Sequence, residues 1–136
     1  MIEQKTLREV TSDMRQNFQT AMGAVEKNNT DYAILLLKGI VQKDPGFLDA
    51  REQLRIIERK KTGSLGFLAK TTSGMKAGSI AAKGTLLVSK NPKKAMRLAE
   101  DALSISLSNK PALNLLAQSA LALEADFILL QEVNLQ

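Results

Sequence analysis

Apolar side chains recur three or four residues apart along most of this chain, and no other feature of the sequence constrains its fold as strongly. This period places side chains on one face of an α-helix, whereas a half-buried strand would show alternation. The first such series, between about residues 3 and 27, is Leu7, Val10, Met14, Phe18, Ala21 and Val25. We therefore expect an all-α fold that begins with a long amphipathic helix.

A second helix is expected over residues 30–43, "TDYAILLLKGIVQK". Ile34 and Leu35 form one apolar face of this helix, and the other apolar face is formed by Ala33, Leu36, Leu37, Ile40 and Val41. A helix that is apolar on more than one side is usually buried between neighbours. We therefore expect this helix to be central in the fold.

Two pairs that contain proline mark helix boundaries. Asp44-Pro45 ends the central helix, because the residue before a proline avoids the helical conformation. The same pair is expected to open a helix over about 46–61, with Asp44 as its N-cap and Pro45 in its first turn. Asn91-Pro92 repeats this arrangement before a helix that is expected to extend to about residue 106.

The segment 62–79, "TGSLGFLAKTTSGMKAGS", is rich in glycine and is expected to be irregular. A helix over about 75–89 overlaps its end. Beyond "SNKPA" another helix is expected, with one face formed by Leu113, Leu116, Ala117 and Ala120. A last helix over 125–135 brings the expected number to about seven.

The composition limits the class of protein. A chain of 136 residues is long enough for the core of one domain. It contains no cysteine and no histidine, which excludes disulfides and the usual zinc ligands. The first ten residues lack an apolar leader, and no apolar run reaches membrane-spanning length. We expect a single soluble, cytoplasmic domain over residues 1–136, or a soluble piece of a longer protein.

Two parts of the sequence share a frame. Ala33, Leu37, Ile40 and Pro45 are matched 62 residues later by Ala95, Ala99, Ala102 and Leu107. Ala21 and Ala117 are a further matched pair. This pattern resembles the tetratricopeptide repeat, a 34-residue pair of antiparallel helices that approach closely at small residues. The separation is six residues short of two repeats, so we infer an irregular unit made of the helix at 46–61 and the glycine-rich segment after it.

The resemblance implies antiparallel helix pairs that stack as a short right-handed solenoid. It also implies a non-catalytic module that binds a protein or peptide, although none of the family's binding residues can be carried over to this chain. A generic helical bundle is the alternative fold. The alternative function is a basic helical module that binds nucleic acid or the ribosome.

No group of residues predicts catalysis, a metal or a cofactor. Glu100 and Asp101 are adjacent carboxylates, but neighbours on a helix point about 100° apart and cannot share a ligand. We interpret them as part of a solvated face. "KAGSIAAKGT" contains glycine and lysine, yet it lacks the spacing of a phosphate-binding loop. The sequence therefore predicts a protein that is not an enzyme.

Charge is unevenly distributed, since residues 55–97 hold eleven bases and one acid, Glu58. The expected helix over 75–89 would align lysines seven residues apart. The candidate contact residues are Lys60, Lys61, Lys76, Lys83, Lys90, Lys93 and Lys94. They form either a solvated face, a surface for an acidic protein or peptide, or a surface for nucleic acid or anionic lipid. Nucleic acid is the less favoured partner, because no aromatic residues alternate with these lysines. The oligomeric state is left open.

Overall fold

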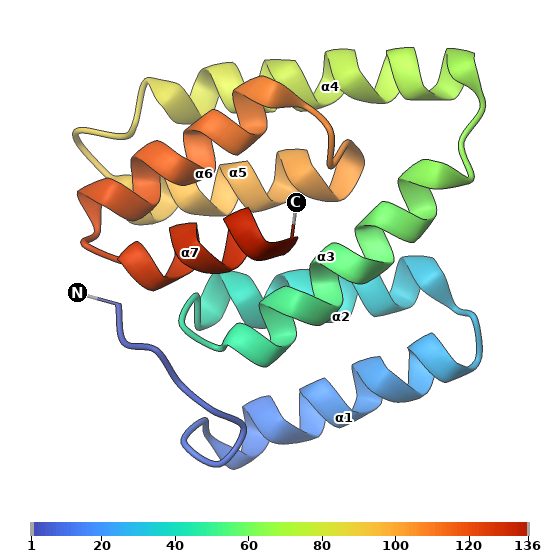
Figure 1. Cartoon of the computed structure of the whole chain (residues 1–136), viewed down its shortest axis with the longest axis vertical. Coiled ribbons are helices and arrows are strands. Elements are labelled where there is room, and N and C mark those ends of the chain that lie inside the picture. Colours follow the sequence, from blue (N-terminus) through green and yellow to red (C-terminus); the bar gives the residue numbers. More distant parts are fainter. Residues whose placement is uncertain (1, 136) are drawn as a thin grey trace.

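The structure is a computed structural model that describes residues 2–135, except for the side chains of residues 67 and 135. Within this range the chain forms seven helices, which confirms the all-α fold. They are α1 (Ser12–Glu26), α2 (Thr30–Lys43), α3 (Leu48–Gly63), α4 (Phe67–Thr85), α5 (Pro92–Ile105), α6 (Lys110–Ala122) and α7 (Asp126–Leu135). Consecutive helices run in opposite directions (Figure 1).

Side-chain caps and prolines explain three of the helix starts. The side chains of Thr11, Asn91 and Asn109 each accept a hydrogen bond from a backbone N–H in the first turn of α1, α5 and α6. Pro92 also lies in the first turn of α5, where no backbone donor is lost. The expected cap at Asp44 is wrong. Its carboxylate instead pairs with the Lys5 ammonium at 3.3 Å, and α3 begins later, after Phe47.

The first helix begins at residue 12, not at about residue 3. The preceding segment is held to the start of α3, since the Lys5 N–H donates to the Gly46 carbonyl at 2.8 Å. A Cβ at Gly46 would collide with the backbone carbonyl of Glu3, so glycine is needed where the two segments cross. Val10 is nevertheless buried, as the apolar spacing predicts.

The glycine-rich segment is not irregular as a whole. Residues 67–79 lie in α4, which continues without a break to Thr85, and only residues 64–66 separate it from α3. Small side chains allow α4 to pack closely on α5 and α6. At Gly84 an added Cβ would overlap Leu115 of α6. The helix ends four residues earlier than expected, and residues 86–90 form turns.

The described residues form two hydrophobic cores. The N-terminal core lies within α1, α2 and α3 and includes Leu37, Phe47 and Leu54. The C-terminal core lies within α4 to α7 and includes Leu103 and Leu115. Helix α2 packs against α1, α3 and α5, which confirms that it is central. Its second apolar face is only partly buried, since Ile34 is buried but Leu35 is 61% exposed.

The two halves follow one pattern. Helices α5 and α6 begin 62 residues after α2 and α3, and the small buried residues Ala33 and Ala50 correspond to Ala95 and Ala112. The expected pairing of α3 with α4 is not found among the principal helix contacts of the described residues. Helix α3 packs against α2, α5 and α7 instead, while α4 packs against α5 and α6. The reason is that α3 directs buried charged side chains toward α5 and α7.

The burial of Ala33 gives a direct test of the packing. This residue is completely buried, so Ala33→Leu should overpack the α2 contacts and cost about 1–3 kcal/mol of unfolding free energy. Urea denaturation would measure it, with Ala122→Leu as the control because Ala122 is exposed. Equal stabilities of the two variants would contradict the packing. Ala117, expected at a similar close contact, is only half-buried, whereas Ala112 and Ala120 of α6 are fully buried.

Candidate functional site

The structure separates the predicted lysines into groups. Lys60 and Lys61 lie near the end of α3, Lys76 and Lys83 lie on α4, Lys90 follows α4, and Lys93 and Lys94 occupy the first turn of α5. The end of α3 and the start of α5 lie at opposite ends of α4 (Figure 1). All of these lysines are exposed except Lys61, which is half-buried and pairs with Asp31 at 3.1 Å. They therefore do not form one compact patch.

The expected stripe of three lysines is shortened. Because α4 ends at Thr85, Lys90 lies in the following turn and not on the helix. Lys76 and Lys83 remain in line, two helical turns apart. Among the described residues neither of them makes an ion pair, so their charges are free for a partner.

An apolar ridge runs beside these two lysines on the outside of α4. It is formed by Leu68 and Met75 of α4 and by Leu86, the C-cap residue directly after the helix, and their exposed fractions are 80%, 73% and 80%. At 100° per residue, these three positions fall within about 20° of one another around the helix axis, and the lysines lie about 60–80° to one side. Helix α4 thus presents exposed apolar surface and positive charge together.

The position of α4 leaves its outer face open to solvent but does not explain why that face is apolar. Helix α4 lies along one edge of the molecule, with all the other helices on one side of it (Figure 1). Helix α1 lies along the opposite edge, yet none of the large exposed apolar side chains belongs to it. Edge position alone therefore does not account for the ridge on α4.

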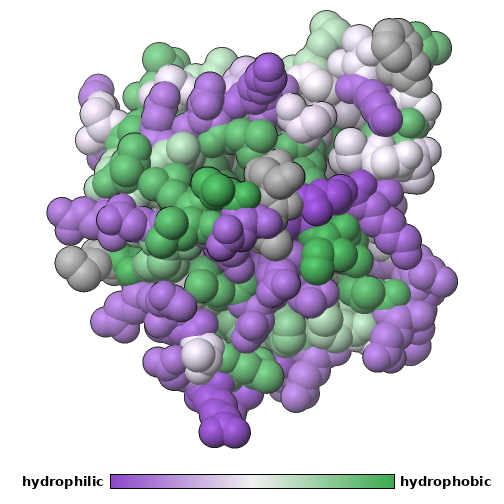
Figure 2. Space-filling view, in the orientation of Figure 1, coloured by the Kyte–Doolittle hydropathy of each residue, from purple (hydrophilic) through white to green (hydrophobic). Residues whose placement is uncertain are grey.

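A second exposed apolar area lies over α6 and α7, in the middle of the face seen in Figure 2. Leu121, Leu130 and Val133 are its exposed residues. Unlike the ridge on α4, it has no row of lysines beside it: α7 carries Asp126 and Glu132 and no basic residue.

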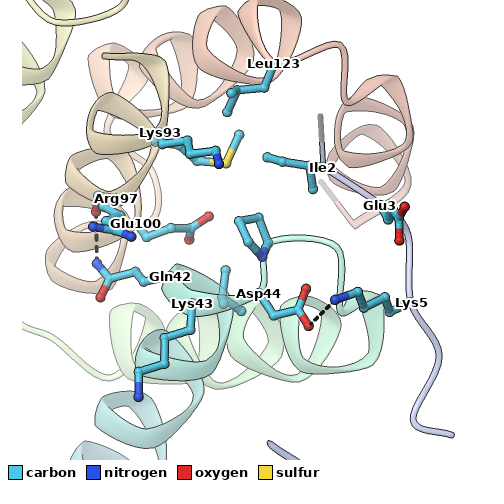
Figure 3. Close-up of a pocket in the computed structure, with 13 residues that line it drawn as sticks. Ile2, Glu3, Lys5, Gln42, Lys43, Asp44, Lys93, Arg97, Glu100 and Leu123 are labelled. Carbon is cyan, nitrogen blue, oxygen red and sulfur yellow. Dashed lines mark hydrogen bonds and ion pairs between the residues drawn. The ribbon is translucent and has the colours of Figure 1, made fainter. Parts of the chain in front are cut away.

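A cavity of about 330 Å³ lies between α2, α5 and the N-terminal segment (Figure 3). Its walls include the apolar side chains of Val41, Met96 and Leu123, while Lys93 and Arg97 supply positive charge. Three carboxylates line the cavity. Asp44 pairs with Lys5 and Glu100 pairs with two arginines, whereas Glu3 is exposed.

Five charged residues form a buried ionic cluster where the two halves of the molecule meet. They are Arg51, Arg55 and Glu58 of α3, Glu100 of α5 and Glu132 of α7. Arg55 contacts all three glutamates: Nη2 donates to Glu100 at 2.8 Å, Nε donates to Glu132 at 2.9 Å, and Nη1 donates to Glu58 at 2.9 Å. Arg51 Nη2 donates to Glu100 at 2.9 Å. The cluster links α3 to both α5 and α7.

The expectation of a solvated face is wrong for Glu100, whereas Asp101 remains partly exposed. Glu100 is completely buried in the ionic cluster, and Asp101 pairs with Lys38 of α2 at 3.1 Å. A signal was present in the sequence, because Arg51 and Arg55 share the face of α3 that carries Leu54. Charges among buried positions of a helix require partners of opposite charge elsewhere.

The surroundings shift the pKa values of the cluster. Burial raises the pKa of Glu58 to about 7, although the Arg55 charge acts in the opposite direction. Burial would also raise the pKa of Glu100, but Arg55 and Arg51 outweigh it and hold that pKa below its usual value. For Arg55, burial opposes the charged form, yet the three glutamates keep its pKa well above the usual value. Near neutral pH, Glu58 is the member that can change its charge.

Comparisons of the chain with protein family models, with curated proteins and with solved structures find no match. The described part of the chain contains no helix long and apolar enough to cross a membrane. Nor do its described residues bring together three or more side chains that could hold a metal ion.

Proposed function

We propose that this chain is a non-catalytic, cytoplasmic binding module that recognises an acidic protein through the outer face of α4. The supporting observation is the ridge of Leu68, Met75 and Leu86 beside two unpaired lysines. Residues 59–99 contain no aspartate or glutamate, so the positive potential there is not cancelled locally. Exposed apolar contacts give affinity, and the charges favour an acidic partner.

The resemblance to the tetratricopeptide repeat supports the same role. In the proposed solenoid, the matched small residues Ala33 and Ala95 mark equivalent close contacts in α2 and α5, and both are fully buried. These two helices also pack against each other. Families of stacked helix pairs commonly use an extended helical surface to bind proteins. The resemblance supports protein binding in general, and the exposed ridge supports the outer face of α4 as its place.

Reversing two charges tests this proposal. The variant Lys76→Glu, Lys83→Glu should retain less of any acidic partner, by about tenfold or more, because like charges would face each other. Affinity-tagged protein would be mixed with cell lysate at low and moderate salt, and each captured protein would be quantified by mass spectrometry. Circular dichroism would check the fold of each variant.

The matched control is Arg8→Glu, Lys27→Glu, which makes the same change in net charge at exposed sites of the N-terminal half. Partners lost by the α4 variant and kept by this control would support the proposal. Equal capture by the two variants would contradict it. If nuclease treatment abolished capture, the lysines would instead serve the alternative function of binding nucleic acid.

A further inference from the structure

We propose that the partner seated on α4 is an acidic amphipathic α-helix that lies along the full length of the ridge. This inference rests on the proposed function, because it specifies the kind of partner for the same surface. Leu68 and Leu86 are 18 residues apart, which is about 27 Å along a helix. Met75 lies between them on the same line. The apolar surface is therefore long and straight.

The backbone of α4 favours a helical partner over an extended one. An extended peptide usually binds by adding a strand to a sheet edge, where backbone donors and acceptors are free. The backbone groups within α4 are already used by its own helical hydrogen bonds. A helix needs no such groups from its partner, because it binds through side chains that fill the grooves of the facing helix. The ridge on α4 can fit such a groove.

The flanks of the ridge differ from each other. On one side, Lys76 and Lys83 are two turns apart, so they match carboxylates seven residues apart on a partner helix. On the other side lie Gly74 and Gly78. An added Cβ at Gly74 would meet no atom within 4 Å, so the packing of the described residues does not require glycine there. Asn109 occupies part of this flank, since its side chain donates to the Gly74 carbonyl at 3.1 Å and lies 3.9 Å from the Cβ position of Gly78. The open space beside the Cβ position of Gly74 remains for a partner.

The ridge is too narrow for a membrane surface. Thr72 and Ser79 are exposed and lie within about 40° of the line through Leu68, Met75 and Leu86. A helix that lies in a bilayer surface buries a broad apolar face, usually with several bulky residues side by side. A partner helix needs only a line of large residues, which α4 provides.

A designed peptide tests the inference. The probe is a fluorescein-labelled helix of about 20 residues, which matches the length of α4, with leucine along one face and glutamate beside it. A second peptide has the same sequence except for two central prolines, which prevent it from forming a helix. A third has lysine in place of glutamate. Vesicles that contain phosphatidylserine are the membrane probe. Fluorescence anisotropy with each peptide, and co-sedimentation with the vesicles, would measure binding to the intact chain.

We expect binding of the acidic helical peptide alone. The variant Met75→Ser, Leu86→Ser should weaken it by about tenfold or more, since central apolar contacts carry most of the affinity in such interfaces. Gly74→Ala should also weaken it while raising the thermal midpoint, because alanine favours a helix but narrows the space for the partner. Gly23→Ala, at an equally open site in α1, should raise the midpoint and leave binding unchanged.

Different results separate the two proposals. If the proline peptide bound as tightly as the helical one, the helical partner would be excluded while an acidic partner would still be supported. If neither acidic peptide bound, and charge reversal on α4 left lysate capture unchanged, both proposals would fail. Stronger binding to the vesicles would replace the helix with a membrane surface. Self-association in sedimentation that Met75→Ser removed would assign the ridge to a second copy of the chain.

Discussion

Replacing Arg55 with methionine is expected to lower the free energy of unfolding by about 3–5 kcal/mol, because one partner of a buried ionic network is removed. The Arg55 guanidinium contacts Glu58, Glu100 and Glu132, and all three would lose their principal neutralising charge. Arg51 would remain, but within the described part of the chain it pairs only with Glu100 and Glu132. Denaturation by urea, followed by circular dichroism, would measure the loss.

A control and a second variant make this result specific. Lys60→Met adds the same side chain at an exposed site on α3 and should change stability little. Arg55→Met combined with Glu58→Met should recover part of the loss, because Glu58 forms its ion pair with Arg55. A loss below about 1 kcal/mol for Arg55→Met would mean that the arginine contributes no more than a surface ion pair.

The second large effect is a fall in stability as the pH rises from about 4.5 to 7. Burial holds the pKa of Glu58 at about 7 in the folded chain, against an ordinary value of 4.5. Within this window the folded chain keeps a proton that the unfolded chain releases, so folding becomes less favourable with increasing pH. The surroundings of Glu58 agree with a raised pKa, since its Oε2 atom makes no hydrogen bond to the described residues.

Because of Glu58, the free energy of unfolding should be about 2–3 kcal/mol lower at pH 8 than at pH 5. Glu58→Gln imitates the protonated carboxyl, so the variant should lose this dependence and should be more stable than the native chain at pH 8. Glu100 acts in the opposite direction, because its pKa is lowered, but its contribution is lost only as the pH falls below its usual value of 4.5. The same pH dependence in Glu58→Gln and the native chain would exclude Glu58 as its source.

Periodicity predicted the helices because it depends on local burial, and the structure confirms that α2 is central. The start of α1 was missed because Leu7 and Val10 fit a helical spacing, while Gly46 holds the neighbouring segment in an extended form. That contact joins parts of the chain about forty residues apart, so the periodicity of apolar residues within one segment cannot predict it. The helical state of 67–79 was missed for a related reason, since close packing on α5 and α6 overrides the low helix propensity of glycine.

The candidate site was predictable only in part. Lys76 and Lys83 were identified from their spacing, and both are exposed on α4. Met75 and Leu86 were not identified as exposed residues, because sequence alone does not show that α4 is an edge helix. The ionic cluster was also missed. Its arginines and glutamates belong to three helices, and their ordinary environment is solvent.

The ionic cluster also sets an order of events while the chain is being made. Glu100 follows Arg55 by 45 residues, and Glu132 follows it by 77 residues. At about 5–20 residues per second, the ribosome needs several seconds to add that second interval. Until then the arginines of α3 lack most of their buried partners and must stay hydrated. The N-terminal half therefore keeps this side open to water until Glu132 of α7 has been synthesised, and the two halves can close on each other only after that point.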